Sequence, residues 1–136
     1  MLTQKFVNDV AYRVIGCAIE VHKQLGPGLL ESVYHECMIE ELIHNGIGLR
    51  SRVSVPIYYR EKLLKGNLIL DLLIEDCLII ELKAVDIMLP VHKAQLLSYL
   101  KLTGKPKGLL INFHVENIVQ HAVHLVTESF AQLPSH

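Results

Sequence analysis

The sequence has few of the features that mark secreted proteins, membrane proteins or small zinc domains. It has only three cysteines, Cys17, Cys37 and Cys77, and no two of them form a CxxC pair. A scattered, odd-numbered set argues against a disulfide framework and a cysteine zinc site, and it fits a reducing cytosol. Charged residues interrupt every apolar run before the ~18 residues that a membrane span needs, and the first residues lack the apolar stretch of a signal peptide. We therefore expect a cytoplasmic protein without membrane contact.

Several common chemistries are also missing. The formal net charge is -1, so no overall positive field indicates a nucleic-acid partner. The sequence contains no GxSxG elbow, no P-loop and no GxGxxG. Among the eight histidines, His121 and His124 could share a helix face, but no third ligand has the spacing of a zinc site.

What is present indicates a well-filled core. The chain has 136 residues, of which 51% are hydrophobic and 20% are charged, and neither a repeat nor a linker divides it. This length is typical of one domain, so we expect residues 1–136 to form a single one.

The apolar spacing predicts helices and strands in a definite order. A first helix over residues 7–25, with Asn8 as its N-cap, ends at Gly26-Pro27-Gly28. The next predicted elements are a helix over 30–45, an exposed edge strand around Val53–Ile57, buried strands at 67–74 and 77–83, a helix over 90–102 and a buried strand at 108–113. Residues 117–130 fit either a helix or a strand, and we assign them to a helix. The core order is αβββαβ with an extra N-terminal helix, which indicates an α/β fold with a mixed central sheet flanked by helices.

Three charged residues stand inside the two buried strands, which otherwise contain almost nothing polar: Asp71, Glu81 and Lys83. Burying a carboxylate in such a strand is costly unless it is paired or bound to a cation. Glu81 and Lys83 are two residues apart and therefore project from the same face. A three-residue turn between the strands places Asp71 directly across from Glu81, whereas a two-residue turn places it diagonally.

In either register the two carboxylates could share a metal ion, and carboxylate ligands with open positions favour Mg²⁺ or Mn²⁺. The alternative is a buried ion pair between Lys83 and one of the two acids. On the predicted helix over 90–102, Gln95 and Tyr99 are four residues apart and share a face, so they could position a water or a phosphate or simply fill the core. Glu31 falls in the first turn of its helix, where an acid also complements the helix dipole.

Gly28, Glu31 and Tyr34 match the motif of the small bacterial GxxExxY family. The stretches Ala18–Glu31, Asp71–Leu73, Glu81–Ala84, Leu89–Leu97 and Gly108–Phe113 are similar to that family as well. The resemblance covers about residues 5–126, and the family is grouped with the PD-(D/E)XK nuclease-like superfamily, whose restriction-endonuclease-like core has the same αβββαβ order.

This resemblance implies a role for each candidate residue. Asp71 corresponds to the acid of the second strand, and Glu81 with Lys83 to the ExK element. Glu31 corresponds to the acid of the first core helix, which holds a metal-bound water or a second ion. Gln95 with Tyr99 resembles the QxxxY element of the exonuclease-like branch, and by the same analogy the carbonyl of Leu82 is a further metal ligand.

We therefore expect a Mg²⁺- or Mn²⁺-dependent nuclease acting on nucleic acid, with DNA as the first candidate substrate. A catalytically weak or inactive nuclease-fold module that binds nucleic acid or supports assembly is the alternative. Basic residues gather around the first hairpin (Arg50, Arg52, Arg60, Lys62 and Lys65), where they either follow phosphates or form an ordinary solvated surface. The first helix is apolar around more than one stripe, which predicts either a homodimer or a helix covered inside the monomer.

Overall fold

The computed structural model describes all 136 residues. Its helices are α1 (Gln4–Leu25), α2 (Glu31–His44), α3 (Pro90–Thr103), α4 (Ile118–His121) and α5 (Glu128–Ala131). Its strands are β1 (Leu49–Tyr59), β2 (Lys62–Ile74), β3 (Leu78–Lys83), β4 (Lys107–Asn112) and β5 (Val123–Val126). None of the helices is long and apolar enough to span a membrane.

The five strands form one mixed sheet in the order β1-β2-β3-β4-β5. The pair β3 and β4 is parallel, and every other neighbouring pair is antiparallel. Helix α3 provides the crossover between the parallel strands, as such a connection requires. The predicted α/β fold with a mixed central sheet is therefore confirmed, and β1 is the edge strand that Pro56 indicated.

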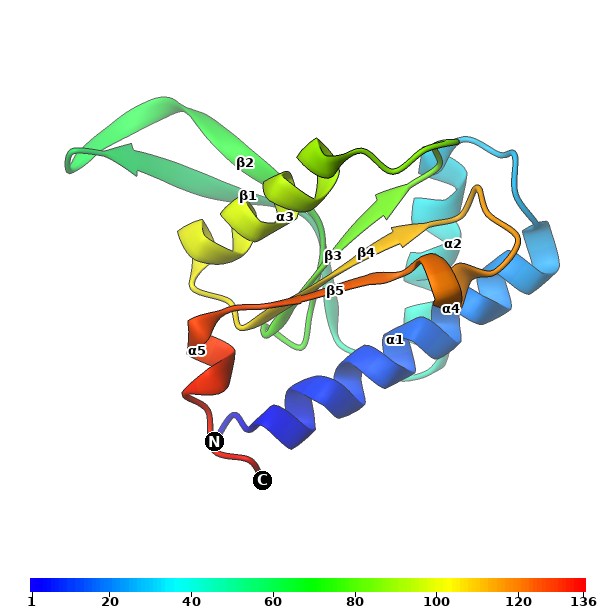
Figure 1. Cartoon of the computed structure of the whole chain (residues 1–136), viewed down its shortest axis with the longest axis horizontal. Coiled ribbons are helices and arrows are strands. Elements are labelled where there is room, and N and C mark those ends of the chain that lie inside the picture. The colour runs from blue at the N-terminus through cyan, green and yellow to red at the C-terminus, as the bar shows by residue number, and fades with distance from the viewer.

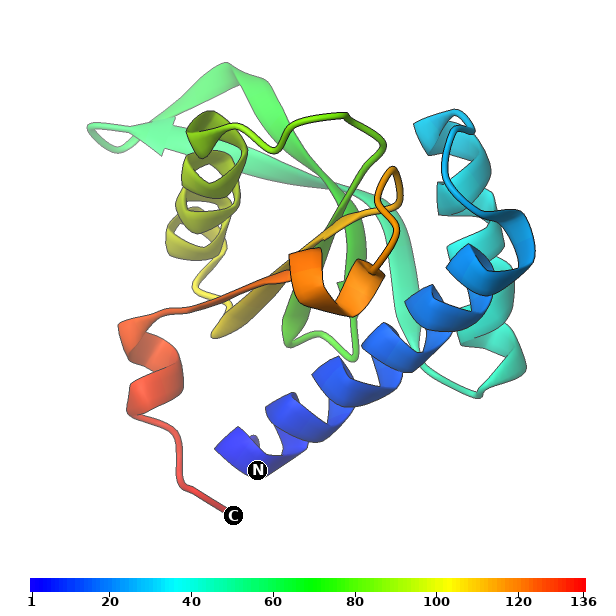
Figure 2. The same cartoon turned by 45° about the vertical axis from the view of Figure 1, so that its right-hand side comes forward.

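Helices cover both faces of this sheet (Figures 1 and 2). On one face, α1 and α2 pack on the larger apolar cluster, which includes Leu72, Ile80 and Ile111. On the other face, α3 packs through Leu96 and Leu100 on a smaller cluster. The alternation of the strands divides their side chains between these two layers.

Helix α1 begins earlier than the sequence predicted. Its N-cap is Thr3, whose hydroxyl accepts a hydrogen bond from the Phe6 amide at 3.0 Å, and the prediction of Asn8 was wrong. The Asn8 side chain instead accepts a bond from the Lys107 ammonium at 3.1 Å. The chain end lies alongside, since Pro134 accepts a bond from the Gln4 amide at 2.8 Å.

The apolar stripes of α1 are covered within the chain. Val10, Val14 and Val21 are all buried in the larger cluster. The monomer therefore accounts for the helix that suggested a partner, and this observation no longer argues for a dimer.

The segment 117–130 is not the single helix that its spacing suggested. Asn117 caps the four-residue helix α4, and Ala122 then takes extended backbone angles and ends it. Val123–Val126 pairs with β4 as β5, because branched residues fit a pleated surface better than a short exposed helix. His121 and His124 consequently lie on different elements and do not share a helix face.

Candidate active site

Asp71 and Glu81 meet where β2 and β3 begin to diverge. The pairing of the two strands runs from Ile74 opposite Leu78 to Leu72 opposite Ile80, and one further step places Asp71 opposite Glu81. The Asp71 amide donates to Glu81 Oε2 at 2.9 Å, and the Leu82 amide donates to Asp71 Oδ2 at 2.9 Å. Each carboxylate thus accepts a backbone amide at the point where the paired stretch ends.

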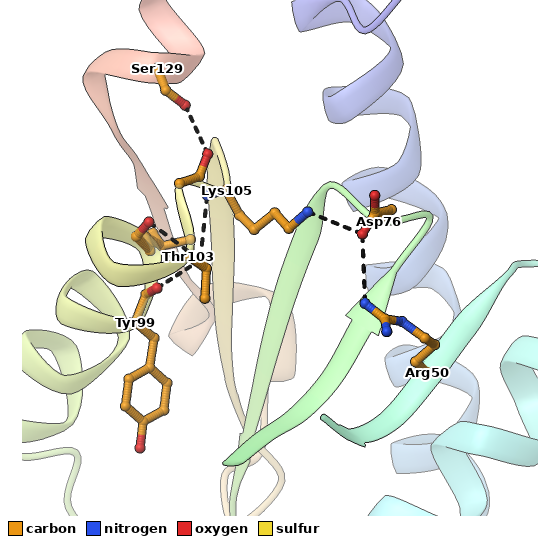
Figure 3. Close-up of polar contacts among 8 residues, drawn as sticks. Arg50, Asp76, Tyr99, Thr103, Lys105 and Ser129 are labelled. Carbon is orange, nitrogen blue, oxygen red and sulfur yellow. Dashed lines mark hydrogen bonds and ion pairs between the residues drawn. The ribbon is translucent and has the colours of Figure 1, made fainter. Parts of the chain in front are cut away.

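A three-residue turn sets this register. Glu75 and Asp76 both adopt left-handed backbone angles, with φ of 49° and 55°. Figure 3 shows Lys105 and Arg50 converging on Asp76, with nitrogen to oxygen distances of 3.0 and 3.7 Å. These contacts connect the turn to β1 and to the loop that follows α3.

Burial and mutual repulsion disfavour the ionised form of the carboxylate pair. Glu81 is only 5% exposed. Burial, followed by the negative charge of Asp71, raises the pKa of Glu81 to about 8. Like charges this close cannot both ionise without a compensating cation. The pair therefore holds a proton near neutral pH, or releases that proton to solvent when a cation binds.

Lys83 shares the face of Glu81 but is not used to neutralise it. The structure contains four ion pairs, and Lys83 is in none of them. It also makes no side-chain hydrogen bond, and it is half-buried. The alternative of a buried Lys83 ion pair is thus not observed, and the ammonium group is free to face a bound anion.

The GxxExxY segment fixes the loop from which Glu31 begins α2. The buried Tyr34 hydroxyl donates to the Gly26 carbonyl at 2.6 Å and accepts from the Leu29 amide at 3.1 Å. Its ring stacks on Phe113, with a centroid separation of 4.5 Å. Gly28 has a φ of 101°, which side chains rarely adopt. Together these features fix the loop that leads into α2.

Glu31, the first residue of α2, lies within electrostatic reach of the carboxylate pair. Partial burial raises the pKa of Glu31, Lys83 lowers it and Asp71 raises it. The influence of these two residues shows that Glu31 lies in the same electrostatic environment. It remains exposed to solvent, at the open side of the site.

Helix α3 lies close to the sheet because β4 carries a glycine. A Cβ added at Gly108 would stand 2.8 Å from Leu96 Cδ1, so any side chain there would push the helix outward. Gln95 is exposed and Tyr99 is half-buried. Burial and then the charges of Glu81 and Asp71 raise the pKa of Tyr99, while hydrogen bonding with Gln95 lowers it. The Tyr99 phenol therefore lies within electrostatic reach of the carboxylate pair.

The sequence did not assign two residues near the pair to the site: Arg52 was counted only among the basic residues of the first hairpin, and His35 was not singled out. Arg52 lies in β1 between Ser51, opposite Leu72, and Val53, opposite Leu70, and hence across from Asp71. Its φ of 51° is strained for a residue other than glycine. His35 is buried, and its Nε2 lies 2.8 Å from Ser51 Oγ. Burial and then Arg52 lower the pKa of His35, so the ring is neutral.

The donor set fits a small divalent cation. Nowhere do three or more His, Cys, Asp or Glu side chains come together as a possible metal cage. Two carboxylates, Asp71 and Glu81, are the side-chain ligands available, and Glu31 lies outside that pair. The Leu82 carbonyl points to the same neighbouring strand as its amide, which donates to Asp71. One or two carboxylates with remaining water positions is how proteins usually bind Mg²⁺.

This combination of a mixed sheet, a carboxylate pair at a strand divergence and a free lysine defines an α/β protein with a restriction-endonuclease-like fold. The family model described as PD-(D/E)XK nuclease superfamily matches residues 8–124. The chain therefore belongs to the PD-(D/E)XK nuclease superfamily, as the resemblance predicted. Nucleases of this superfamily generally use divalent metals.

Solved structures support the fold. The structure described as "Crystal structure of SSO0001" is 26% identical in sequence, with a TM-score of 0.55. The similarity covers 70% of this chain and 48% of that chain, so this chain spans about half the length of that relative. No curated protein matches the sequence.

Proposed function

We propose that the protein is a metal-dependent phosphodiesterase that hydrolyses nucleic acid, with DNA as the first substrate to test. We also propose that it is a GxxExxY-type member of its superfamily and that its whole length forms one nuclease-like domain. The observation that carries the proposal is the carboxylate pair of Asp71 and Glu81, with Lys83 unpaired on the face of Glu81.

We assign Asp71, Glu81 and the Leu82 carbonyl as the residues that would hold Mg²⁺ or Mn²⁺. A divalent ion bound there supplies activation of a water molecule and neutralisation of phosphate charge. The raised pKa of Glu81 supports this assignment, because a site that strains to hold a second negative charge gains most from a cation.

The remaining residues act on the substrate and the attacking water. Lys83, free of any ion pair, would stabilise the negative charge that develops on the scissile phosphate. Glu31, whose pKa is raised, would orient the water and accept its proton. Gln95 and Tyr99 would hold a phosphate oxygen or that water by hydrogen bonds.

Cleavage of labelled single-stranded, double-stranded and branched DNA in Mg²⁺ and in Mn²⁺ tests the proposal. We expect wild-type activity, and we expect Lys83→Ala to abolish it without unfolding the protein, because a half-exposed lysine contributes little to packing. Lys23→Ala, a change of an exposed lysine on α1, is the control. Wild-type inactivity on all three substrates with both metals would count heavily against the proposal.

Calorimetric titration with Mn²⁺ tests the metal ligands separately. We expect a binding isotherm for the wild type that Asp71→Asn removes. If the wild type and the variant give the same flat trace, Asp71 and Glu81 form only a proton-sharing pair.

A second function is supported by the small ligand set. With only two side-chain carboxylates available, the protein could bind nucleic acid without cleaving it, as a nuclease-fold module. Strong binding with a steep negative dependence on salt, combined with no cleavage, would select this function.

Homodimerisation stays a prediction, and a light-scattering mass near 15.4 kDa would rule it out.

A further inference from the structure

The β1–β2 hairpin extends beyond the body of the molecule as an arm, which we define as residues 56–67 (Figures 1 and 2). Strands β1 and β2 pair with each other along this stretch, but β3 pairs with β2 only at Leu72–Ile74. Almost every side chain of the arm is exposed. Because no helix or neighbouring strand covers it, the arm contributes little to the core of the protein.

The side chains of the arm are unusual for an exposed hairpin. Tyr58 and Tyr59 are 61% and 56% exposed, and Leu63 is 56% exposed. A two-stranded ribbon gains little stability of its own in water, and clustered exposed apolar groups usually mark a contact surface. The arm therefore has the composition of a binding element.

Charge identifies the kind of partner. Residues 49–74 contain five Arg and Lys residues and two acids, which gives this hairpin a net charge of +3 in a chain of net charge -1. Three of the cations, Arg60, Lys62 and Lys65, belong to the arm. A basic element on an otherwise acidic molecule is complementary to a polyanion.

The geometry of the arm tip favours unpaired bases. Arg60 and Glu61 both have positive φ, 50° and 66°, and form the two-residue turn that tight hairpins favour. The Arg60 guanidinium lies over the Tyr59 ring at 5.8 Å from its centroid. Tyr58, opposite Leu63, lies on the other face of the ribbon and is free to stack on a base. Cations along a backbone track combined with aromatic stacking are typical of single-strand binding.

The arm is continuous with the candidate active site. Asp71 lies on β2 nine residues after Lys62, a span of ~30 Å in an extended strand. A strand held along the arm would therefore lead directly to the carboxylate pair.

We propose that residues 56–67 bind a single-stranded nucleic-acid segment that crosses the ribbon, with a phosphate on Lys62 on the face of Tyr59, and with a phosphate on Lys65 and an unpaired base on Tyr58 on the opposite face. This inference rests on the proposed function for the identity of the polyanion. It extends that function in two ways: the arm is the part of the protein that binds the substrate, and the substrate is a strand with unpaired bases.

Fluorescence anisotropy with labelled single-stranded and duplex DNA in EDTA tests the arm without any cleavage. We expect Tyr58→Ala to weaken single-strand binding about tenfold, and Tyr58→Phe to bind like the wild type. The double variant Lys62→Ala/Lys65→Ala should reduce the slope of log affinity against log salt by about 1.4. The charge-matched variant Lys5→Ala/Lys23→Ala on α1 should leave binding unchanged.

Unchanged single-strand binding by the arm variants, or an equal loss of single-strand and duplex binding in Tyr58→Ala, would overturn the proposal. Light scattering provides the remaining check, since an arm that holds two copies together would give a dimeric wild type and a monomeric Tyr58→Ala. That result would also overturn it. Thermal unfolding should show all variants folded, because the substituted side chains are exposed. Failure of the arm leaves the catalytic proposal intact, since its test is cleavage.

Discussion

Replacing Glu81 by Gln is expected to stabilise the protein at alkaline pH while removing the metal-dependent cleavage that we propose. The wild-type carboxyl has a pKa raised from 4.5 to about 8, first by burial and then by Asp71. The folded state therefore binds this proton more tightly than the unfolded state does. The resulting stability is fully present below pH 4.5 and is lost as the pH rises through 8.

The shift sets the size of the effect. At about 1.4 kcal/mol per pKa unit, a rise from 4.5 to about 8 corresponds to at most about 5 kcal/mol at pH 9. Water at the half-exposed Asp71 side reduces this cost, so we expect about 2 to 4 kcal/mol, a large share of a typical folding free energy. A Gln side chain has nearly the same shape, keeps an oxygen for the Asp71 amide and carries no charge.

Urea unfolding in EDTA between pH 5 and pH 9 measures this. The stability advantage of Glu81→Gln should grow as the pH rises, whereas Glu116→Gln, a change of an exposed acid without polar partners, should show no such trend. Addition of Mn²⁺ should restore wild-type stability at pH 9 and leave Glu81→Gln unchanged. If Glu81→Gln is equally destabilised at both ends of the range, the carboxylate pair is not strained and the reasoning is wrong.

Three further predictions concern residues around the pair. Tyr34→Phe keeps the stacked ring but removes two hydrogen bonds to the loop, so we expect thermal unfolding to show a loss of about 1 to 3 kcal/mol in the free energy of unfolding. We also expect weaker cleavage, because Glu31 would be displaced. Unchanged activity would mean that Glu31 has no role. Gly108→Ala should cost about 1 to 3 kcal/mol, because α3 must shift away from β4, and an unaffected melting temperature would contradict this. Glycine adopts the left-handed backbone angle of residue 52 without strain, so Arg52→Gly should be more stable than Arg52→Ala by up to about 1 kcal/mol. Both variants should cleave poorly. Equal stabilities would show that the backbone at this position is not strained.

The sequence predicted the parts of the fold that burial patterns control. Strands β3 and β4 appear as short apolar runs, and helix α3 lies between a proline and a glycine. Asp71 and Glu81 were recognisable as candidate site residues because burying a carboxylate in an apolar strand costs free energy. These features depend on the free energy of moving side chains out of water, which a sequence reports directly.

Other features depend on interactions that no single segment contains. Two possible registers of Asp71 and Glu81 were left open because only the left-handed turn at Glu75 and Asp76 decides between them. Strand β5 was hidden because its stability comes from pairing with β4. An arginine in an exposed strand, such as Arg52, is ordinarily a solvated charge, and only its backbone angle and its place across from Asp71 distinguish it.

The divergence of β2 from β3 explains why the candidate site lies where it does. The pairing of β2 and β3 ends at Leu72 and Ile80, and beyond this point the amides of Asp71 and Leu82 bond to carboxylate oxygens. Because the strands separate, each carboxylate receives one of these amides through one oxygen, which fixes its orientation. The departing part of β2 continues into the exposed arm. The same separation therefore holds the two acids in place and frees the basic hairpin to reach a substrate.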